Sequence, residues 1–299
     1  MSGLSEGTEN SILNGDYKSE RKDIFFELQT TNLVCSHIAY YSDNVYNYVI
    51  HTHEVPELMY IKQINGSYIA EGTEYHLKAG DLILVPPAVH HSIKRNPDSV
   101  YERYDLCFDE NIFPEFDFKK IFEKINVINC LNNNIISDIF GKFDFYAENF
   151  GDKDLENIII LLLKEMFYNF TLDSISEKKD NIYFNRVLTD AVNYINQNLF
   201  SIKSVSEISR TLYITDTYLY KIFKNGLQTS PKKYITSKRL LHARQKIIQG
   251  SKPTDIYQEC GFNDYVSFYR NYISFFGYSP SQEKGDITNR KFIDSDNLK

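Results

Sequence analysis

The sequence predicts a two-domain α+β protein, with an antiparallel β-sandwich or small barrel followed by an all-helical domain. From residue 23 to residue 108, short aromatic and β-branched runs alternate with turn signals such as SDN, ING and KAGD. After residue 114 the apolar period becomes helical. Residues 1–180 hold 16 Lys and Arg against 30 Asp and Glu, whereas residues 181–299 hold 17 against 10. This opposite charge predicts that the C-terminal half meets a polyanion.

Length and composition restrict the class of protein. The 299 residues, 42% of them hydrophobic, are enough for two cores. The longest apolar run, Ile158 to Leu163, is too short for a membrane span, and the N-terminus lacks a signal-peptide core. We therefore expect a cytoplasmic protein without a membrane partner. The four cysteines lie far apart without a CxxC pair, which predicts reduced thiols.

Composition and periodicity divide the chain into six segments. We expect a flexible tail at 1–20, the barrel at 21–112, a helical segment at 113–172, a linker at 173–182, the helical domain at 183–284 and a flexible tail at 285–299. The run DKDLENIIILLLKEMFYNFTL in the helical segment is apolar on more than one face. We interpret it as the dimerisation helix of a homodimer, so that Leu162→Asp should weaken self-association. A helix wholly internal to its own domain is the alternative.

Residues 204–225 predict a helix-turn-helix unit. Ser204 and Glu207 have the spacing of a capping box, and Val205 begins an apolar face that ends at the YIT break. The second helix buries Leu219 and Phe223 with Ile222. Two short helices joined by a tight turn place the second one in the DNA major groove, which is about 12 Å wide.

The same arrangement returns at residues 252–275. Pro253 suits a first helical turn, Gly261 suits a turn that needs positive φ, and Asn263 or Asp264 can cap the next helix. Aligning the two units pairs Leu219 with Phe268, Lys221 with Arg270 and Phe223 with Tyr272. The chain therefore contains an internal repeat with conserved chemistry at these positions.

One continuous helix is expected between the units, with Ser230 as cap, Pro231 at the first position and Gly250 as stop. Its length of about 28 Å is close to the roughly 34 Å between successive major-groove faces of B-DNA. Its basic residues are expected to contact phosphates: Lys232, Lys233, Lys238, Arg239 and Arg244. Solvated surface is the alternative for each of them.

The outward positions of both units are the expected contacts to double-stranded DNA. In the first unit and the connecting helix they are Thr215, Thr217, Tyr220, Lys221, Lys224 and Arg239; in the second unit they are Tyr265, Ser267, Arg270 and Asn271.

The words SPKKYITSKRLLHA, CGFNDYVSFYRNY and FFGYSP give residues 183–282 a specific resemblance to the DNA-binding domain of AraC-type transcription regulators. The resemblance implies a DNA-binding regulator with RNA polymerase as a further partner if its output is activation. One departure stands out, because Ile273 and Ser274 occupy positions where the family usually has lysines. We therefore expect the first unit to contribute more to DNA affinity than the second.

Two N-terminal segments, HTHEVPE and GDLILVPPAVHHS, resemble the motifs of a cupin barrel, which is the sensor domain expected in such a regulator. His51 and His53 are two apart on one strand and so face the same side, where Glu57 and His91 can join them. Three imidazoles and a carboxylate suit a divalent metal such as zinc, iron, manganese or nickel. The alternative is that they line an effector cavity without metal, and no cofactor is then required.

Tyrosines in the barrel, Tyr60 and Tyr68 among them, suggest a sugar-like small-molecule effector. The alternative is that tyrosine simply fills the sheet faces. The leading functional hypothesis is a ligand-responsive regulator that is not an enzyme. Two others stay open: a metal-dependent cupin enzyme with an accessory DNA-binding domain, and a constitutive regulator whose barrel only mediates protein contacts.

Overall fold

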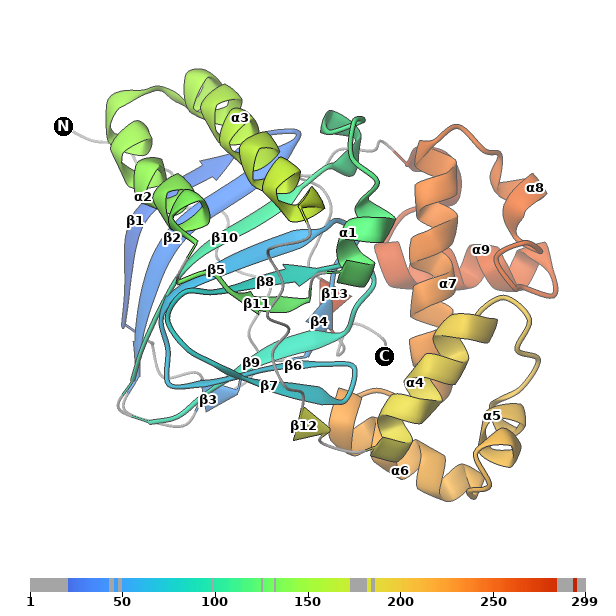
Figure 1. Cartoon of the computed structure of the whole chain (residues 1–299). Helices are drawn as coiled ribbons and strands as arrows, with labels where there is room; N and C mark the ends of the chain where they lie inside the picture. The colour runs from blue at the N-terminus through green and yellow to red at the C-terminus, as the bar shows by residue number, and fades with distance from the viewer. Residues whose placement is uncertain are drawn as a thin grey trace.

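The computed structural model describes residues 21–42, 46–47, 50–97, 99–124, 126–131, 133–172, 182–183, 186–283 and 293–294. They form a sheet-rich N-terminal part and a helical C-terminal part (Figure 1). We call these the sheet domain (described residues up to 172) and the helical domain (186–283). The predicted two-domain α+β class is confirmed.

The strands of the sheet domain form two antiparallel sheets, the second of which also takes in β12 and β13 from later in the chain. The first has the order β1-β2-β10-β5-β8-β11, and the second has the order β12-β7-β6-β9-β4-β13, with β3 paired to β9. The strands are β1 (Arg21–Gln29), β2 (Leu33–Ser42), β3 (Tyr46–Asn47), β4 (His51–Thr52), β5 (Glu57–Gln63), β6 (Gly66–Ala70), β7 (Thr73–Leu77), β8 (Asp81–Val85), β9 (His91–Arg95), β10 (Ser99–Phe108), β11 (Val127–Asn129), β12 (Ile182–Tyr183) and β13 (Ile293–Asp294).

Alternation along the strands separates two cores. On β10, Tyr101 joins an apolar cluster with side chains of both sheets, including Tyr68 and Ile93. Leu106 and Phe108 point the other way and pack under the helices of the sheet domain. Those helices are η1 (Glu110–Ile112), α1 (Phe118–Lys124), α2 (Asn134–Asn149) and α3 (Asp152–Thr171).

Helices α2 and α3 lie side by side across the outer face of the first sheet (Figure 1). Leu162 is only 8% exposed and belongs to the core beneath α3, whereas its neighbour Leu161 is 66% exposed. The expectation that Leu162 lies at a subunit interface is therefore wrong. A charge at this position would be buried in the domain's own core.

The helical domain is built around one long helix. α7 (Pro231–Ile248) contributes Tyr234 and Ile235 to the core of the first helix-turn-helix unit, and Leu240 and Ala243 to the core of the second. The other helices are α4 (Arg186–Asn198), α5 (Val205–Thr211), α6 (Asp216–Leu227), α8 (Pro253–Ile256), α9 (Tyr265–Phe276) and η3 (Pro280–Gln282). Figure 1 shows α7 running from the α4/α6 side to the α8/α9 side.

Most of the predicted helix ends in this domain are confirmed. The Ser230 side chain accepts from the Lys233 amide, the Asp264 side chain accepts from the Ser267 amide, and Gly250 has a positive φ. The predicted capping box is wrong in its bonding. Helix α5 does begin after Ser204, but the Glu207 carboxylate accepts from the Lys203 amide and no side-chain bond of Ser204 caps the helix.

Arg239 ties the two units together from inside the domain. Its guanidinium donates to the carbonyls of Leu199 and Ile202 near the first unit and to that of Gly261 in the second, each at 2.8 Å. Gly261 has a φ of 82°, and a β-carbon there would lie 2.7 Å from Arg239 Nε. This turn therefore requires glycine for its backbone conformation and for the space that Arg239 occupies.

Short strands attach both ends of the helical domain to the sheet domain. Ile182–Tyr183 pair with β7, and Ile293–Asp294 pair with β4. The prediction of a flexible tail is therefore wrong for residues 293–294, while the rest of that tail, the tail at 1–20 and residues 173–181 of the linker lie outside the described residues. The four cysteines are free and buried, as predicted. Among the described helices, none has the length and apolarity that crossing a bilayer requires.

We predict that Arg239→Ala destabilises the protein by about 3 kcal/mol, because three carbonyls lose a charged donor. Urea unfolding followed by circular dichroism measures the change. The matched control, Lys233→Ala, removes an exposed cation from the same helix and should stay within about 0.5 kcal/mol of the wild type. Equal stability of the two variants would contradict the role given to Arg239.

Candidate functional site

Helix α6 presents one continuous outward face. Thr217, Tyr220, Lys221 and Lys224 are all exposed, while Leu219 and Phe223 are fully buried on the opposite side. Thr215 caps the helix by accepting from the Tyr218 amide. We call the four exposed residues the first face.

Helix α9 presents the equivalent face, but the residues exposed on it differ from those predicted. Arg270 is exposed as expected, whereas Tyr265, Ser267 and Asn271 are half-buried. The Asn271 amide donates to the Ser267 carbonyl. The most exposed apolar side chains of the helix are instead Val266, Tyr269 and Ile273. With Arg270 they form the second face, which the sequence analysis missed because it took only polar residues as contacts.

Three of the basic residues of α7 point inward, so they are not arranged for the phosphate contacts expected of them. Lys238 is buried against Glu71, and Arg244 is buried against Glu54 and Glu283. Arg239 binds backbone carbonyls, as described above. Lys232 and Lys233 remain exposed at the start of the helix, as expected.

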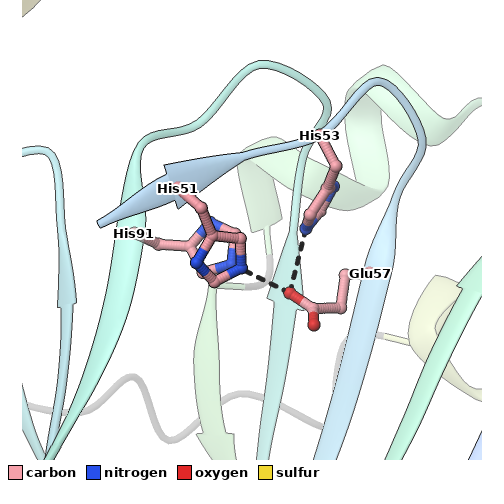
Figure 2. Close-up of side chains that lie close together, drawn as sticks. All are labelled: His51, His53, Glu57 and His91. Carbon is pink, nitrogen blue, oxygen red and sulfur yellow. Dashed lines mark hydrogen bonds and ion pairs between the residues drawn. The ribbon is translucent and has the colours of Figure 1, made fainter. Parts of the chain in front are cut away.

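The structure brings the four predicted barrel residues together. His51 opens β4 and pairs across the sheet with His91, which opens β9; His53 follows β4, and Glu57 opens β5 (Figure 2). The Nε2 atoms of His53 and His91 each lie 3.0 Å from Glu57 Oε2. One potential ligand atom from each of the four residues lies within 4.8 Å of all the others.

Backbone carbonyls orient two of these imidazoles. His53 Nδ1 lies 2.7 Å from the Val55 carbonyl oxygen, and His91 Nδ1 lies 3.0 Å from that of Val89. Each ring therefore turns Nε2 toward the carboxylate. Metal-binding histidines are commonly held in the same way, with one ring nitrogen fixed by an outer partner and the other facing the metal.

The buried carboxylate and imidazoles of this cluster stabilise one another's charges. Burial alone would raise the pKa of Glu57, but His53 and His91 hold it well below 4.5. Burial alone would lower the pKa of His53, but Glu57 raises it above 6.5. Burial and the nearby Glu57 raise the pKa of Asp105 to about 7, despite its bonds from Arg103. Sequence analysis missed Asp105, because its approach to Glu57 depends on the pairing of β10 with β5.

The two tyrosines predicted to line the effector cavity lie in different parts of the sheet domain. Tyr68 lies between the sheets with its ring 6.0 Å from that of His91, and its hydroxyl has no hydrogen-bond partner among the described residues. Tyr60 lies on the opposite face of the first sheet, where it stacks on Phe140 of α2 at 4.3 Å. Its place in an effector pocket with the histidines was therefore a wrong prediction.

Polar contacts join the sheet domain to α7. Glu71, in the turn between β6 and β7, lies 2.6 Å from Lys238 Nζ and accepts from the Tyr234 hydroxyl at 2.5 Å. Glu54, which directly follows His53, forms an ion pair with Arg244. The residue next to His53 in sequence is therefore ion-paired with the connecting helix α7.

Comparison with known proteins agrees with this arrangement. A family model described as an AraC-like ligand binding domain matches residues 33–115, and one described as a helix-turn-helix domain matches residues 208–284. The chain is 25% identical over 249 residues to the lactose operon transcription activator of Staphylococcus xylosus, covering 79% of this chain and 85% of that one.

It is also 25% identical over 293 residues to the raffinose operon regulatory protein RafR of Pediococcus pentosaceus, covering 92% of this chain and 99% of that one. Among solved structures, wild-type ToxT of Vibrio cholerae with a bound unsaturated fatty acid aligns over 85% of this chain and 95% of its own, with 15% identity and a TM-score of 0.38.

We predict that Glu57→Gln destabilises the protein most between about pH 4.5 and 6.5, by about 3 kcal/mol. The lowered pKa of Glu57 means that its contribution is present above 4.5 and lost as the pH falls through the folded-state pKa. The raised pKa of His53 means that its contribution is present below 6.5 and lost as the pH rises through the folded-state pKa.

Urea unfolding at several pH values measures this dependence. The control, Glu27→Gln on the exposed side of β1, should cost little at any pH. A loss of stability in Glu57→Gln that does not vary from pH 4 to pH 9 would contradict the charge interaction between Glu57 and His53.

Proposed function

This chain belongs to the AraC-type transcription regulators, and we propose that it reads one operator through α6 and α9 while a small molecule bound in the sheet domain controls that reading. It is a DNA-binding regulator with a ligand-binding domain. The role needs no covalent chemistry. We propose that it acts in the cytoplasm, where its operator lies.

The observation that carries the proposal is the relation of the two faces to α7. Both faces are exposed, and α7 runs unbroken between their units for 18 residues. At about 1.5 Å per residue this gives about 27 Å, near the spacing of roughly 34 Å between successive major-groove segments on one side of B-DNA. The arrangement supports reading of two adjacent groove segments by one chain.

We propose a saccharide as the effector class. The space between the sheets holds aromatic rings with hydroxyl tips, including Tyr68, Tyr75 and Tyr101. The unpartnered hydroxyl of Tyr68 is an unmet hydrogen-bonding group in this region. Two relatives are named as regulators of the lactose and raffinose operons, which is consistent with a saccharide here.

The imidazole cluster also fits a divalent metal. Three imidazoles and one carboxylate are suitable donors, and two of the rings are already oriented by carbonyls. We propose that His51, His53, Glu57 and His91 would hold such an ion. A bound ion would supply a Lewis-acidic anchor for a ligand hydroxyl.

The coupling proceeds, in this proposal, through Glu54 and Arg244. His53 and Glu54 are consecutive, so a ligand that shifts His53 also shifts the acidic partner of a buried cation on α7. Breaking a buried ion pair leaves an uncompensated charge, which costs about 3–5 kcal/mol. Occupancy of the pocket therefore has an energetic route to the position of both reading helices.

We further propose a homodimer formed through the outer side of α3. Leu161 and Tyr168 are exposed on this helix, 66% and 57% respectively, and Phe145 is exposed on α2 beside it. Large exposed apolar side chains on two adjacent helices are typical of a subunit interface. If the output is activation, RNA polymerase is a further partner.

Operator binding is tested with Lys221→Ala and Arg270→Ala. Each should weaken binding of the selected operator by about 1–3 kcal/mol and relax sequence preference at one position if it reads a base edge. Fluorescence anisotropy at fixed salt measures the affinity. Lys142→Ala, an exposed change on α2, is the control; if all three variants bind like the wild type, α6 and α9 do not read DNA.

Ligand binding is tested by unfolding with three probes, namely lactose, raffinose and Zn²⁺. A ligand at about 100 times its Kd should stabilise the folded state by about 2.7 kcal/mol. Tyr68→Phe should reduce the effect of the saccharide, and Glu57→Gln should reduce that of Zn²⁺. His76→Ala, a change at an exposed histidine of β7, should leave the effects of the saccharides and of Zn²⁺ unchanged. If neither saccharide stabilises the protein, the saccharide assignment is contradicted, and if Zn²⁺ does not, the metal assignment is contradicted.

The dimer is tested with Leu161→Asp, which should shift sedimentation toward the monomer while the protein stays folded. Leu162→Asp should instead unfold the sheet domain, because that side chain is buried. Lys153→Ala on the first turn of α3 is the control. A folded Leu161→Asp variant with unchanged self-association would exclude this face as the interface.

A further inference from the structure

The two reading faces occupy equivalent positions but differ in chemistry. The alignment that pairs Leu219 with Phe268 also pairs Thr217 with Val266, Tyr220 with Tyr269 and Lys224 with Ile273. The buried sides agree, since Leu219, Phe223, Phe268 and Tyr272 are all fully buried. The outward difference therefore belongs to the faces themselves.

The first face is polar and carries two cations, Lys221 and Lys224. The second face carries one cation, Arg270, beside an apolar stripe. Val266 is 57% exposed, and Tyr269 and Ile273 are 37% exposed each. Neither aliphatic side chain belongs to the core clusters of the helical domain.

An apolar stripe beside one arginine is suited to the thymine methyl groups of the major groove. Thymine is the base that presents a methyl group there, and aliphatic side chains contact it, whereas arginine recognises guanine through O6 and N7. A lysine at the Ile273 position would favour phosphate instead. From these residues we propose that α9 reads thymine methyl groups through Val266 and Ile273, beside a guanine contacted by Arg270, while α6 supplies the more cationic contacts.

The spacing along the helix limits the segment that is read. Val266 and Ile273 are seven residues apart, or about 10.5 Å along the axis at about 1.5 Å per residue. This corresponds to about three base pairs at roughly 3.4 Å each. Arg270 lies between them in sequence, so all three contacts fall within one short segment of the groove.

The test rests on the proposed function and begins with selection of binding sites by the full chain from a randomised duplex library. Each thymine of the selected site is then replaced by deoxyuridine, which removes only the methyl group. We expect about a fourfold loss of affinity for each contacted methyl, confined to one segment of about three base pairs.

Val266→Ser and Ile273→Ser should each bind thymine and uracil equally at one of those positions. Thr217→Ala, the change at the position equivalent to Val266 on α6, should retain the thymine preference in this segment. Because these side chains are exposed, circular dichroism and the unfolding midpoint should match the wild type for all three variants.

An unchanged affinity for the uracil sites would overturn the inference. So would serine variants that retain the thymine preference, because other residues would then be the ones that read the methyl groups. Failure of the full chain to enrich any sequence would contradict the proposed function itself and remove the basis of the inference with it.

Discussion

Three cations of α7 that point inward determine how the parts of this molecule are joined. Lys238 is held by Glu71 and Arg244 by Glu54, both from the sheet domain, while Arg239 donates to carbonyls just before the first helix-turn-helix unit and within the second. An unpaired charge buried at any of these places would be costly, so each pair constrains α7 strongly. Both helix-turn-helix units pack on this helix, and the sheet domain is joined to it by ion pairs.

The same three residues show where sequence analysis reaches its limit. A lysine or arginine on a helix in a basic domain usually indicates a solvated or phosphate-binding surface, and nothing local to α7 signals the acidic partners. Glu54 and Glu71 lie more than 160 residues away, in the turns of another domain. Tyr60 is a similar case, because its side of the sheet depends on strand register, which local composition does not determine.

Most features that depend on local geometry were predicted correctly, the capping box at Ser204 being an exception. Ser230, Asp264 and Gly250 mark helix ends because caps need particular side chains or a positive φ close by in sequence. Strand parity predicted that His51 and His53 share a side, and the pairing of β4 with β9 brings His91 opposite His51. The second face was missed for another reason: an exposed Val266 or Ile273 has no polar signal, and only the structure shows that it is exposed.

The proposed ligand site includes His53, whose neighbour Glu54 pairs with Arg244 of α7, and α7 joins the two units whose faces we propose to read DNA. A ligand that binds one arrangement of α7 better than another shifts the population of DNA-competent chains. Our central proposal is that α7 holds the two faces at the spacing of adjacent turns of one DNA duplex. Hydroxyl-radical footprinting of the full chain on its selected site tests it most directly. The account predicts protected patches in pairs about 10.5 base pairs apart on one side of the helix; a single unpaired patch, or patches out of phase with the helical turn, would contradict it.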